Sequence, residues 1–242
     1  VRTSTVTGEG LDQLKARLSQ LESSDEAIEQ PDAFRMAIDR SFTISGHGTV
    51  VTGTIASGTV SVGDELELMP LMRKVRVRSI QRHDQSVETI GRGNRAAINL
   101  VGVHHTEVHR GQELATPGYL EATQRLTVEI FAARDAPRPL RHRGRYRLHL
   151  GTNEVTASLS LLEVKAPEIN QPTYAQFRLA KPVVSVFGQP FIVREESPPA
   201  TLAGGRILQP VARGIRRKQA ATIEAVRQLA AALPEARLLR SL

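Results

Sequence analysis

The chain has 242 residues, enough for two domains that each bury a core. It contains no Cys, which excludes disulfides, Cys metal ligands and Cys nucleophiles, and no apolar run long enough to predict a membrane-spanning helix. The net charge of +7 is uneven: residues 1–121 have 13 Lys and Arg against 16 Asp and Glu, and residues 122–242 have 19 against 9. The second half therefore favours a polyanionic partner, nucleic acid before membrane, with an inert basic surface as the alternative.

Residues 1–24 predict the end of an α/β domain. Leu11, Leu14, Leu18 and Leu21 are spaced by three, four and three residues, which is typical of one apolar stripe on a helix. A strand and a helix alone cannot bury both faces, so we expect this segment to belong to a larger domain. Residues 25–31 are acidic and polar and end at a proline, which predicts a linker.

Residues 32–118 predict an antiparallel β-barrel. Phe34, Met36 and Ile38 alternate with less apolar residues, and a glycine-rich turn at 46–48 leads into the β-branched stretch 49–55. Gly53 lies inside that stretch and predicts a bulge or a close backbone approach. Further short strands are expected at 62–69, 73–80 and 96–103, which together favour a closed barrel.

Residues 119–210 predict a second barrel, so the fold class is mainly β, two consecutive antiparallel barrels with flanking helical segments. Strands are expected at 126–131, 155–162, 176–179 and 191–194, with a basic loop and strand at 138–149. Gly204 and Gly205 are expected to punctuate the end of this domain. Residues 211–242 predict a linker and then a helix, whose apolar face holds Ile223, Val226, Leu229 and Leu233.

The sequence lacks the motifs of the common enzyme sites. It has no G-x-x-x-x-G-K-[ST] phosphate loop and no G-x-S-x-G nucleophile turn, so we expect no catalytic residue, no cofactor and no enzymatic activity in this chain alone. His104, His105 and His109 lack an H-E-x-x-H pattern, and solvated histidines are the expected outcome rather than a metal site.

Asp39, Arg40 and Arg95 are candidates for an anion-binding pocket. Asp39 and Arg40 are adjacent, so on a regular strand their side chains would point to opposite faces. Arg95 interrupts an otherwise apolar strand, and a buried guanidinium needs a partner, either Asp39 or a ligand. Two interpretations stay open: a structural pair at the edge of the hairpin, or a pocket in which Arg40 and Arg95 accept an anionic group.

The densest basic cluster lies in the second barrel. Arg143, Arg145 and Arg147 alternate, so a strand would place them on one face, where they could contact phosphates. A solvated face without a partner is the alternative. The cluster also includes Arg138, Arg141, His142 and Tyr146.

Several of these stretches together resemble the selenocysteine-specific elongation factor family (SelB), a relative of EF-Tu among the translational GTPases. Residues 34–44 and 46–54 look like the opening of that family's second domain, and 98–118 like its end. Residues 148–152 and 201–208 resemble third-domain motifs. The barrel motifs are shared with other translational GTPases, whereas Asp39 and Arg40 together with Arg95 are similar to the selenocysteine branch.

The resemblance implies a fragment that binds selenocysteinyl-tRNA and delivers it to the ribosome at recoded UGA codons. Asp39, Arg40 and Arg95 would recognise the anionic selenocysteine end. The second barrel would hold the acceptor and T stem of the tRNA. Its implied contacts are Arg141, His142, Arg143, Arg145 and Arg194.

The resemblance also implies what other parts of such a protein would do. Ser4 and Thr5 are similar to the last guanine-recognition loop of the GTPase domain, although the family usually has Ala where Thr5 stands. The parent protein resembles a GTPase, so GTP and Mg²⁺ would bind the parent protein and not this chain. Winged-helix domains that bind an mRNA hairpin would begin near Ala220. A monomeric, cytoplasmic protein without membrane contact is expected.

The sequence leaves two alternatives open. The barrels could belong to another tRNA-binding translational GTPase, EF-Tu-like or initiation-factor-like, in which Arg40 and Arg95 are structural. They could also form a pair that binds protein or ribosomal RNA without tRNA specificity.

Overall fold

The computed structural model describes residues 1–22, 32–44, 48–163, 166–169, 171–197, 200–215 and 219–231. The chain divides into two units, residues 1–32 and 33–242. In the first unit, helix α1 (Leu11–Glu22) confirms the helix expected from the leucine spacing, and Leu14 and Leu18 are exposed on it. No helix among the described residues is long and apolar enough to cross a membrane.

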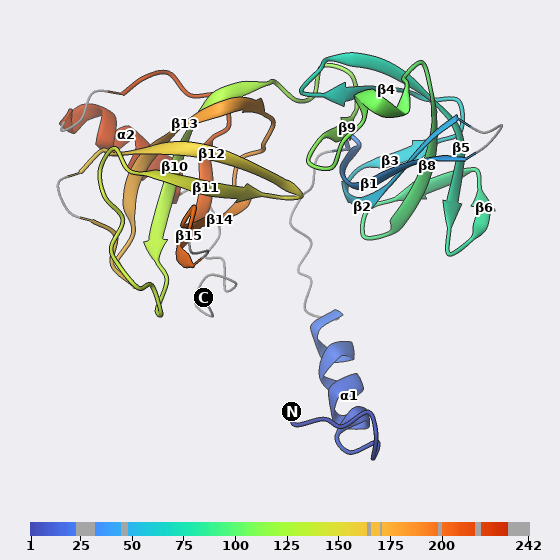
Figure 1. Ribbon diagram of the computed structural model, residues 1–242, viewed down its shortest axis with the longest axis horizontal. Coiled ribbons are helices and arrows are strands. Elements are labelled where there is room, and N and C mark those ends of the chain that lie inside the picture. The colour runs from blue at the N-terminus through green and yellow to red at the C-terminus, as the bar shows by residue number, and fades with distance from the viewer. Residues whose placement is uncertain are drawn as a thin grey trace. The chain divides into compact units, whose positions relative to one another are not determined.

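The second unit begins with a closed barrel (Figure 1). Its strands run in the order β4-β9-β1-β2-β8-β5, and the pairing of β5 with β4 closes the ring. Strand β6 pairs with β5 outside the ring, and β3 and β7 form a separate two-stranded sheet. Its core is formed mainly by Val, Ile and Leu. The strands are β1 (Arg35–Ile44), β2 (Gly48–Ser57), β3 (Thr59–Ser61), β4 (Glu65–Met69), β5 (Arg73–Arg82), β6 (Gln85–Val87), β7 (Thr89–Gly91), β8 (Arg95–Val101) and β9 (Glu113–Ala115), with a 3-10 turn η1 (His105–Glu107).

The second barrel closes in the order β10-β13-β12-β11-β14-β15. Helix α2 (Ala220–Ala231) packs Val226 and Ala230 against Leu162, Tyr174 and Leu208 on the outside of this barrel. The two closed antiparallel barrels confirm the predicted fold class. The strands are β10 (Thr123–Ala132), β11 (Arg145–Leu150), β12 (Asn153–Leu161), β13 (Thr173–Val183), β14 (Pro190–Arg194) and β15 (Thr201–Gln209).

Two glycines permit close backbone contacts inside the barrels. A Cβ at Gly53 would lie 2.2 Å from the carbonyl oxygen of Ala37, which confirms the predicted close approach. The expectation that Gly204 and Gly205 end the second barrel is wrong, because both lie within β15, the strand that closes it. A Cβ at Gly205 would lie 2.0 Å from the carbonyl oxygen of Glu129, so that residue serves strand packing rather than a turn.

Polar and apolar contacts join the two barrels. Arg35 donates to Glu113 through Nε (2.5 Å) and Nη2 (2.9 Å), and Nη2 also donates to Gln189 Oε1 of the second barrel (2.7 Å). Thr152 donates its hydroxyl to the carbonyl oxygen of Ile38 at 2.8 Å. An apolar cluster formed by Met69, Ala115, Leu120 and Val184 completes the contact. The second barrel therefore touches β1 immediately before Asp39.

Candidate functional site

A β-bulge determines how Asp39 and Arg40 are presented. Ile38 opposes Gly53 and Arg40 opposes Thr52, so Asp39 is an extra residue in β1 without a partner of its own. Residues directly opposite on antiparallel strands share a face, which places Arg40 on the outer face with Thr52. The expectation that Asp39 and Arg40 point to opposite faces is therefore wrong, because the bulge breaks the alternation and Asp39 also reaches Thr52.

The Asp39 carboxylate accepts hydrogen bonds from two neighbouring strands. Arg95, the first residue of β8, donates through Nη1 to Oδ2 and through Nη2 to Oδ1, the latter at 2.9 Å. Thr52 donates its hydroxyl to Oδ1 at 2.7 Å, and Arg95 Nη2 lies 3.3 Å from that hydroxyl oxygen. Asp39 is thus held by β2 and β8 together, in a bidentate arginine–carboxylate pair.

The pair is accessible to solvent. The Arg95 side chain is 51% exposed and that of Asp39 is 25% exposed, so Arg95 is not the buried guanidinium that the sequence suggested. Partial burial by itself would raise the pKa of Asp39. Hydrogen bonds from Arg95 and Thr52, with the charges of Arg95 and Arg40, outweigh that effect and hold its pKa below the ordinary value.

Arg40 is the uncompensated cation of this cluster. It is exposed, and it forms no hydrogen bond or ion pair with another residue that the structure describes. Its charge nevertheless helps to lower the pKa of Asp39, the residue before it in the bulge. Two guanidinium groups around one carboxylate leave a net positive charge on an accessible face. Such an arrangement can accept an anion through Arg40 without first breaking the Asp39–Arg95 pair.

The predicted stem-binding residues of the second barrel fall into a loop and two strands. The loop before β11 contains Arg141, His142 and Arg143. Two hydrogen bonds of 2.7 Å hold this loop in place: the Arg141 amide donates to the Tyr146 hydroxyl, and the Arg143 amide donates to the Leu159 carbonyl. The His142 ring accepts a hydrogen bond from the Leu161 amide at 3.2 Å. Arg141 and Arg143 are exposed on this loop.

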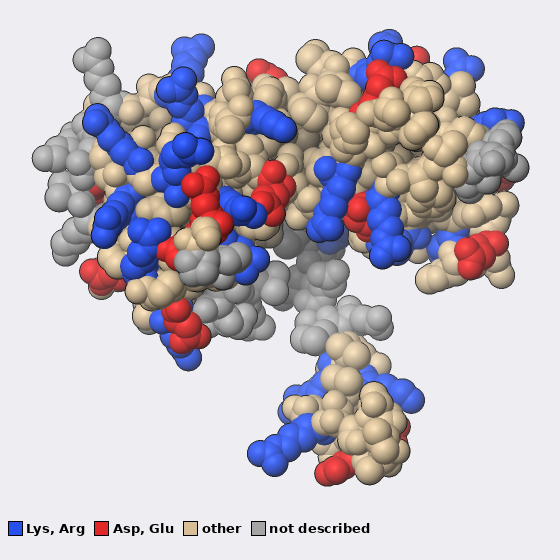
Figure 2. All heavy atoms as spheres, in the orientation of Figure 1, with Lys and Arg blue, Asp and Glu red and all other residues tan. Residues whose placement is uncertain are grey.

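The remaining predicted residues lie on neighbouring strands. Arg145 and Arg147 share the outer face of β11, but Arg143 lies in the preceding turn with φ of 64°, so the expected row of three on one strand is wrong. Arg147 opposes Arg194 of β14 and pairs with Glu154 at 2.9 Å. Arg145 lies 3.7 Å from Glu196. Figure 2 shows Lys and Arg gathered on the visible face of this barrel.

The other sequence candidates lie elsewhere. Ser4 and Thr5 belong to the first unit, where the Ser4 hydroxyl accepts a hydrogen bond from the Thr7 amide at 3.2 Å. Within the described ranges, no three His, Asp or Glu side chains come close enough together to hold a metal ion. The predicted linker at 25–31 lies outside the described residues, as do Arg216, Arg217 and Lys218 of the linker predicted after the second barrel.

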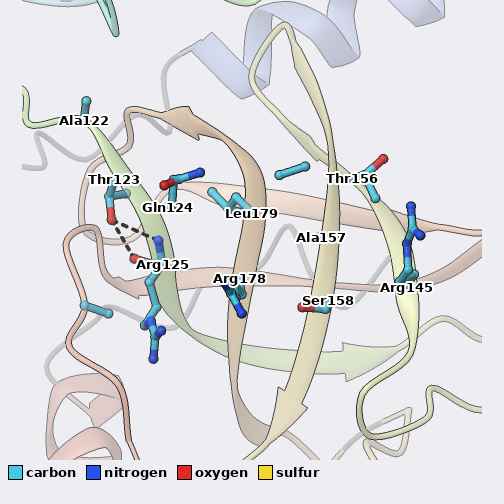
Figure 3. A pocket seen from close by; sticks show the side chains of 12 residues that line it. Ala122, Thr123, Gln124, Arg125, Arg145, Thr156, Ala157, Ser158, Arg178 and Leu179 are labelled. Carbon is cyan, nitrogen blue, oxygen red and sulfur yellow. Dashed lines mark hydrogen bonds between the residues drawn. The ribbon is translucent and has the colours of Figure 1, made fainter.

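Sequence reasoning missed Thr52 as a hydrogen-bond partner of Asp39, and it missed the contact between Arg125 and Arg178. Thr52 was one of several threonines in a β-branched strand, and only its place opposite the bulge distinguishes it. Arg125 and Arg178 are 53 residues apart in the sequence, and they oppose each other on two paired strands (Figure 3). No local sequence pattern reveals this contact.

Comparisons with known proteins cover both barrels. A family model for elongation factor Tu domain 2 matches residues 48–115, and one for the beta-barrel domain of selenocysteine-specific elongation factor matches residues 123–213. The selenocysteine-specific elongation factor of Desulfomicrobium baculatum is 38% identical over 242 residues, 100% of this chain and 38% of that protein. The Escherichia coli (strain K12) protein of that name is 34% identical over 220 residues, 90% of this chain and 34% of that protein.

Solved structures agree with these matches. The crystal structure of a bacterial selenocysteine-specific elongation factor, EF-Sec, gives a TM-score of 0.78 at 26% identity, covering 95% of this chain and 37% of that one. The apo form of SelB from Methanococcus maripaludis gives 0.73 at 26% identity, covering 92% and 51%. The chain thus spans about a third to a half of the proteins it matches. Because family models, relatives and solved structures agree over both barrels, this chain belongs to the selenocysteine-specific elongation factor (SelB) family.

Proposed function

We propose that this chain is the part of an elongation factor that grips selenocysteinyl-tRNA for delivery to the ribosome at recoded UGA codons. The observation that carries the proposal is the presentation of Arg40 and Arg95 on one outer face of the first barrel, around the Asp39 carboxylate. The similarity along the whole chain to a relative named selenocysteine-specific supports the same assignment.

The chemistry of the aminoacyl group explains how such a site would discriminate. A selenol is more acidic than a thiol, so a selenocysteinyl group is anionic at neutral pH and a seryl group is not. Arg40 would donate charge-assisted hydrogen bonds to that anion, while Arg95, held in place by Asp39, would add a second positive charge. A neutral seryl group would displace water from both cations without replacing those bonds, which favours the charged substrate.

The second barrel would hold the acceptor and T stem. Phosphates and 2′-hydroxyl groups of the stem would be contacted by Arg141, Arg143, Arg145 and Arg194. His142 would act mainly by fixing the loop, because its ring already accepts the Leu161 amide.

Other parts of the parent protein would supply the remaining functions. GTP and Mg²⁺ would bind a GTPase domain to which Ser4 and Thr5 belong, and an mRNA hairpin would bind domains that follow this chain. The present residues would provide recognition of the charged tRNA, and no chemical step is assigned to them.

The test compares two aminoacyl groups on one tRNA body. With the parent protein in its GTP-bound form, the affinity for selenocysteinyl-tRNA should exceed that for seryl-tRNA by at least about 100-fold, or ~2.7 kcal/mol. Arg40→Ala and Arg95→Ala should each reduce this ratio, and Arg76→Ala, an exposed arginine on β5, serves as the matched control.

Each other outcome selects an alternative. Equal affinity for the two aminoacyl groups would contradict a selective pocket. It would favour a tRNA-binding barrel pair without selenocysteine specificity, the interpretation that the elongation factor Tu match favours. Equal affinity for charged and uncharged tRNA would instead indicate binding of ribosomal RNA or protein.

A further inference from the structure

The turn between β11 and β12 of the second barrel bonds to the backbone of β1 in the first barrel. The Thr152 hydroxyl donates to the Ile38 carbonyl oxygen at 2.8 Å, and Ile38 itself is fully buried. This carbonyl group and the amide of Asp39 belong to one planar peptide unit. A hydrogen bond to that oxygen therefore restrains the peptide group that leads into the bulge.

The bulged residue depends on its neighbours for its position. The Ile38 amide donates to the Gln112 carbonyl at 2.9 Å, and the Gly111 amide donates to the Ile38 carbonyl at 3.1 Å. Asp39, by contrast, has no partner of its own in the pairing of β1 with β2. The extra residue of a bulge lacks the ladder contacts of a regular strand residue, so the residues before and after it determine where it lies. Thr152 thus supplies one of the two hydrogen bonds to the carbonyl on which the bulge begins.

The turn that carries Thr152 packs closely against the first barrel. Gly151 has a φ of 58°, and a Cβ there would lie 4.0 Å from the Ala37 Cβ. A Cβ at Gly111 would lie 3.1 Å from the Asn153 Cα, so this glycine lets the turn approach the loop before β9. The hydroxyl of Thr152 is therefore presented by backbone that is itself supported by the first barrel.

A buried ion pair stabilises the same junction. Arg35 bonds both Glu113 of the first barrel and Gln189 of the second, and Arg35 and Glu113 are 7% and 4% exposed. Glu113 of β9 lies opposite Ala37, one residue before the carbonyl that Thr152 bonds. Separating the barrels here would leave a buried charge without a full set of partners, which costs free energy. The junction therefore holds the turn at a fixed place beside the bulge.

We propose that Thr152 is a positioning residue for the aminoacyl site. By restraining the Ile38 carbonyl, it sets how the bulge presents Asp39 and Arg40. Charge-assisted hydrogen bonds depend on distance and direction, so a displaced bulge would present Arg40 less well to an anionic group. This role rests on the proposed function of that site, and it makes aminoacyl selectivity depend on the second barrel as well as the first.

The test uses the GTP-bound parent protein and compares selenocysteinyl-tRNA with seryl-tRNA on one tRNA body. Thr152→Val replaces the hydroxyl by a methyl group, and it should weaken selenocysteinyl-tRNA about three- to ten-fold, within the range that loss of one hydrogen bond spans. Affinity for seryl-tRNA should change much less, because a neutral group gains little from Arg40. Thr152→Ser keeps the hydroxyl and should restore the affinity ratio.

Ser57→Ala is the matched control. The Ser57 hydroxyl also donates to a backbone carbonyl oxygen at 2.8 Å, that of Ala33, and Ser57 is the last residue of β2. This variant loses a bond of the same kind and length from the first barrel, and it should leave the affinity ratio unchanged. An affinity ratio in Thr152→Val equal to that of the wild type would overturn the positioning role, whether both affinities fall together or neither changes. Failure of Thr152→Ser to restore the ratio would overturn the role of the hydroxyl.

A second measurement separates this role from the proposed function. Burial raises the pKa of the Asp39 carboxyl, but hydrogen bonds from Arg95 and Thr52 outweigh that effect and hold the pKa below 3.8. A displaced bulge would weaken those bonds, so NMR titration of the 242-residue chain should give a higher Asp39 pKa in Thr152→Val than in the wild type or Ser57→Ala. Equal binding of both aminoacyl groups by the wild-type parent would contradict the proposed function, and this titration would still test Thr152. Equal Asp39 pKa values in the wild type and Thr152→Val would overturn the positioning role.

Discussion

Two arginine–carboxylate pairs of the first barrel are both bidentate and have different surroundings. Arg35 and Glu113 form a bidentate pair whose side chains are 9% and 5% exposed, while Arg95 and Asp39 form one whose side chains are 51% and 25% exposed. The buried pair also bonds Gln189 of the other barrel, whereas the exposed pair lies beside the unpaired Arg40. Burial thus separates an ion pair that fixes two barrels together from one that a ligand can reach.

The difference follows from what surrounds each arginine. Removing water from a charge costs free energy that only a complete set of partners offsets, so the buried pair cannot exchange its partner cheaply. The exposed pair keeps water on one side, and its arginine can share its donors with an incoming anion.

The largest effect is expected from Glu113→Ala. This change leaves the Arg35 guanidinium buried with Gln189 as its one acceptor among the described residues, and it should lower the free energy of unfolding by ~3–5 kcal/mol. The measurement is urea-induced unfolding followed by circular dichroism. Glu65→Ala is the control, because the Glu65–Lys74 pair is exposed and its loss should cost under ~1 kcal/mol. Equal losses of stability in the two variants would show that burial does not set the strength of these ion pairs.

A smaller effect is expected from Thr152→Val. The change removes the hydrogen bond from the second barrel to the Ile38 carbonyl and should cost ~0.5–1.5 kcal/mol. Because Ile38 precedes the bulge, the amide resonances of Asp39 and Arg40 should also shift in NMR spectra. Thr156→Val, on the same hairpin, provides the control. Shifts confined to residues near 152 would show that the bulge holds its shape without this contact.

Asp39→Asn should have a still smaller effect on stability, under ~1 kcal/mol at neutral pH, since the pair is exposed. The pKa of Asp39 is below its ordinary value of 3.8 in the folded state. The unfolded chain therefore takes up the proton first as pH falls, so the stabilisation is complete above about pH 4 and is lost as pH drops through the folded pKa. The difference between wild type and variant should shrink accordingly in unfolding measured from pH 5 downward. A difference independent of pH would contradict this account.

The smallest effect on stability is expected at His149, whose side chain is partly buried. Burial lowers its pKa below 6.5, the charges of Arg194 and Arg147 lower it further, and Glu154 opposes the shift. The unfolded chain binds the proton more tightly, so stability should fall as pH drops below about 6.5 towards the folded pKa. An NMR titration of the ring should give a midpoint below 6.5, and His149→Gln should remove this part of the pH dependence. A midpoint above 6.5 would show that Glu154 dominates.

Local patterns predicted the strands well where one face of a strand is buried. The alternation at Phe34, Met36 and Ile38 gave β1, and the short β-branched runs gave most of both barrels, because side-chain alternation depends only on the residues of the strand itself. Gly53 was also predicted correctly as a close approach. Gly204 and Gly205 were misassigned, since the sequence does not distinguish a glycine that makes room for a neighbouring strand from one that forms a turn.

The candidate site depended on pairing that sequence does not display. The extra residue in β1 is defined only by its register with β2, so the common face of Asp39 and Arg40 could not be deduced from their adjacency. The Arg35–Gln189 bond joins residues 154 positions apart, and the Arg125–Arg178 pair joins two strands of a closed ring. Such contacts follow from the order of strands in the barrels, which many sequences with the same alternation could arrange differently.

Closure of both sheets has a consequence for how copies of this chain can associate. Every strand in the two rings has a neighbour on each side, and the described strands with a single neighbour, β3, β6 and β7, have only three residues each. Exposed strand edges are the usual template for sheet-to-sheet aggregation between molecules. Because no long strand among the described residues is left with a single neighbour, self-assembly by strand addition is disfavoured, and concentrated solutions should stay free of fibrils while the barrels remain folded.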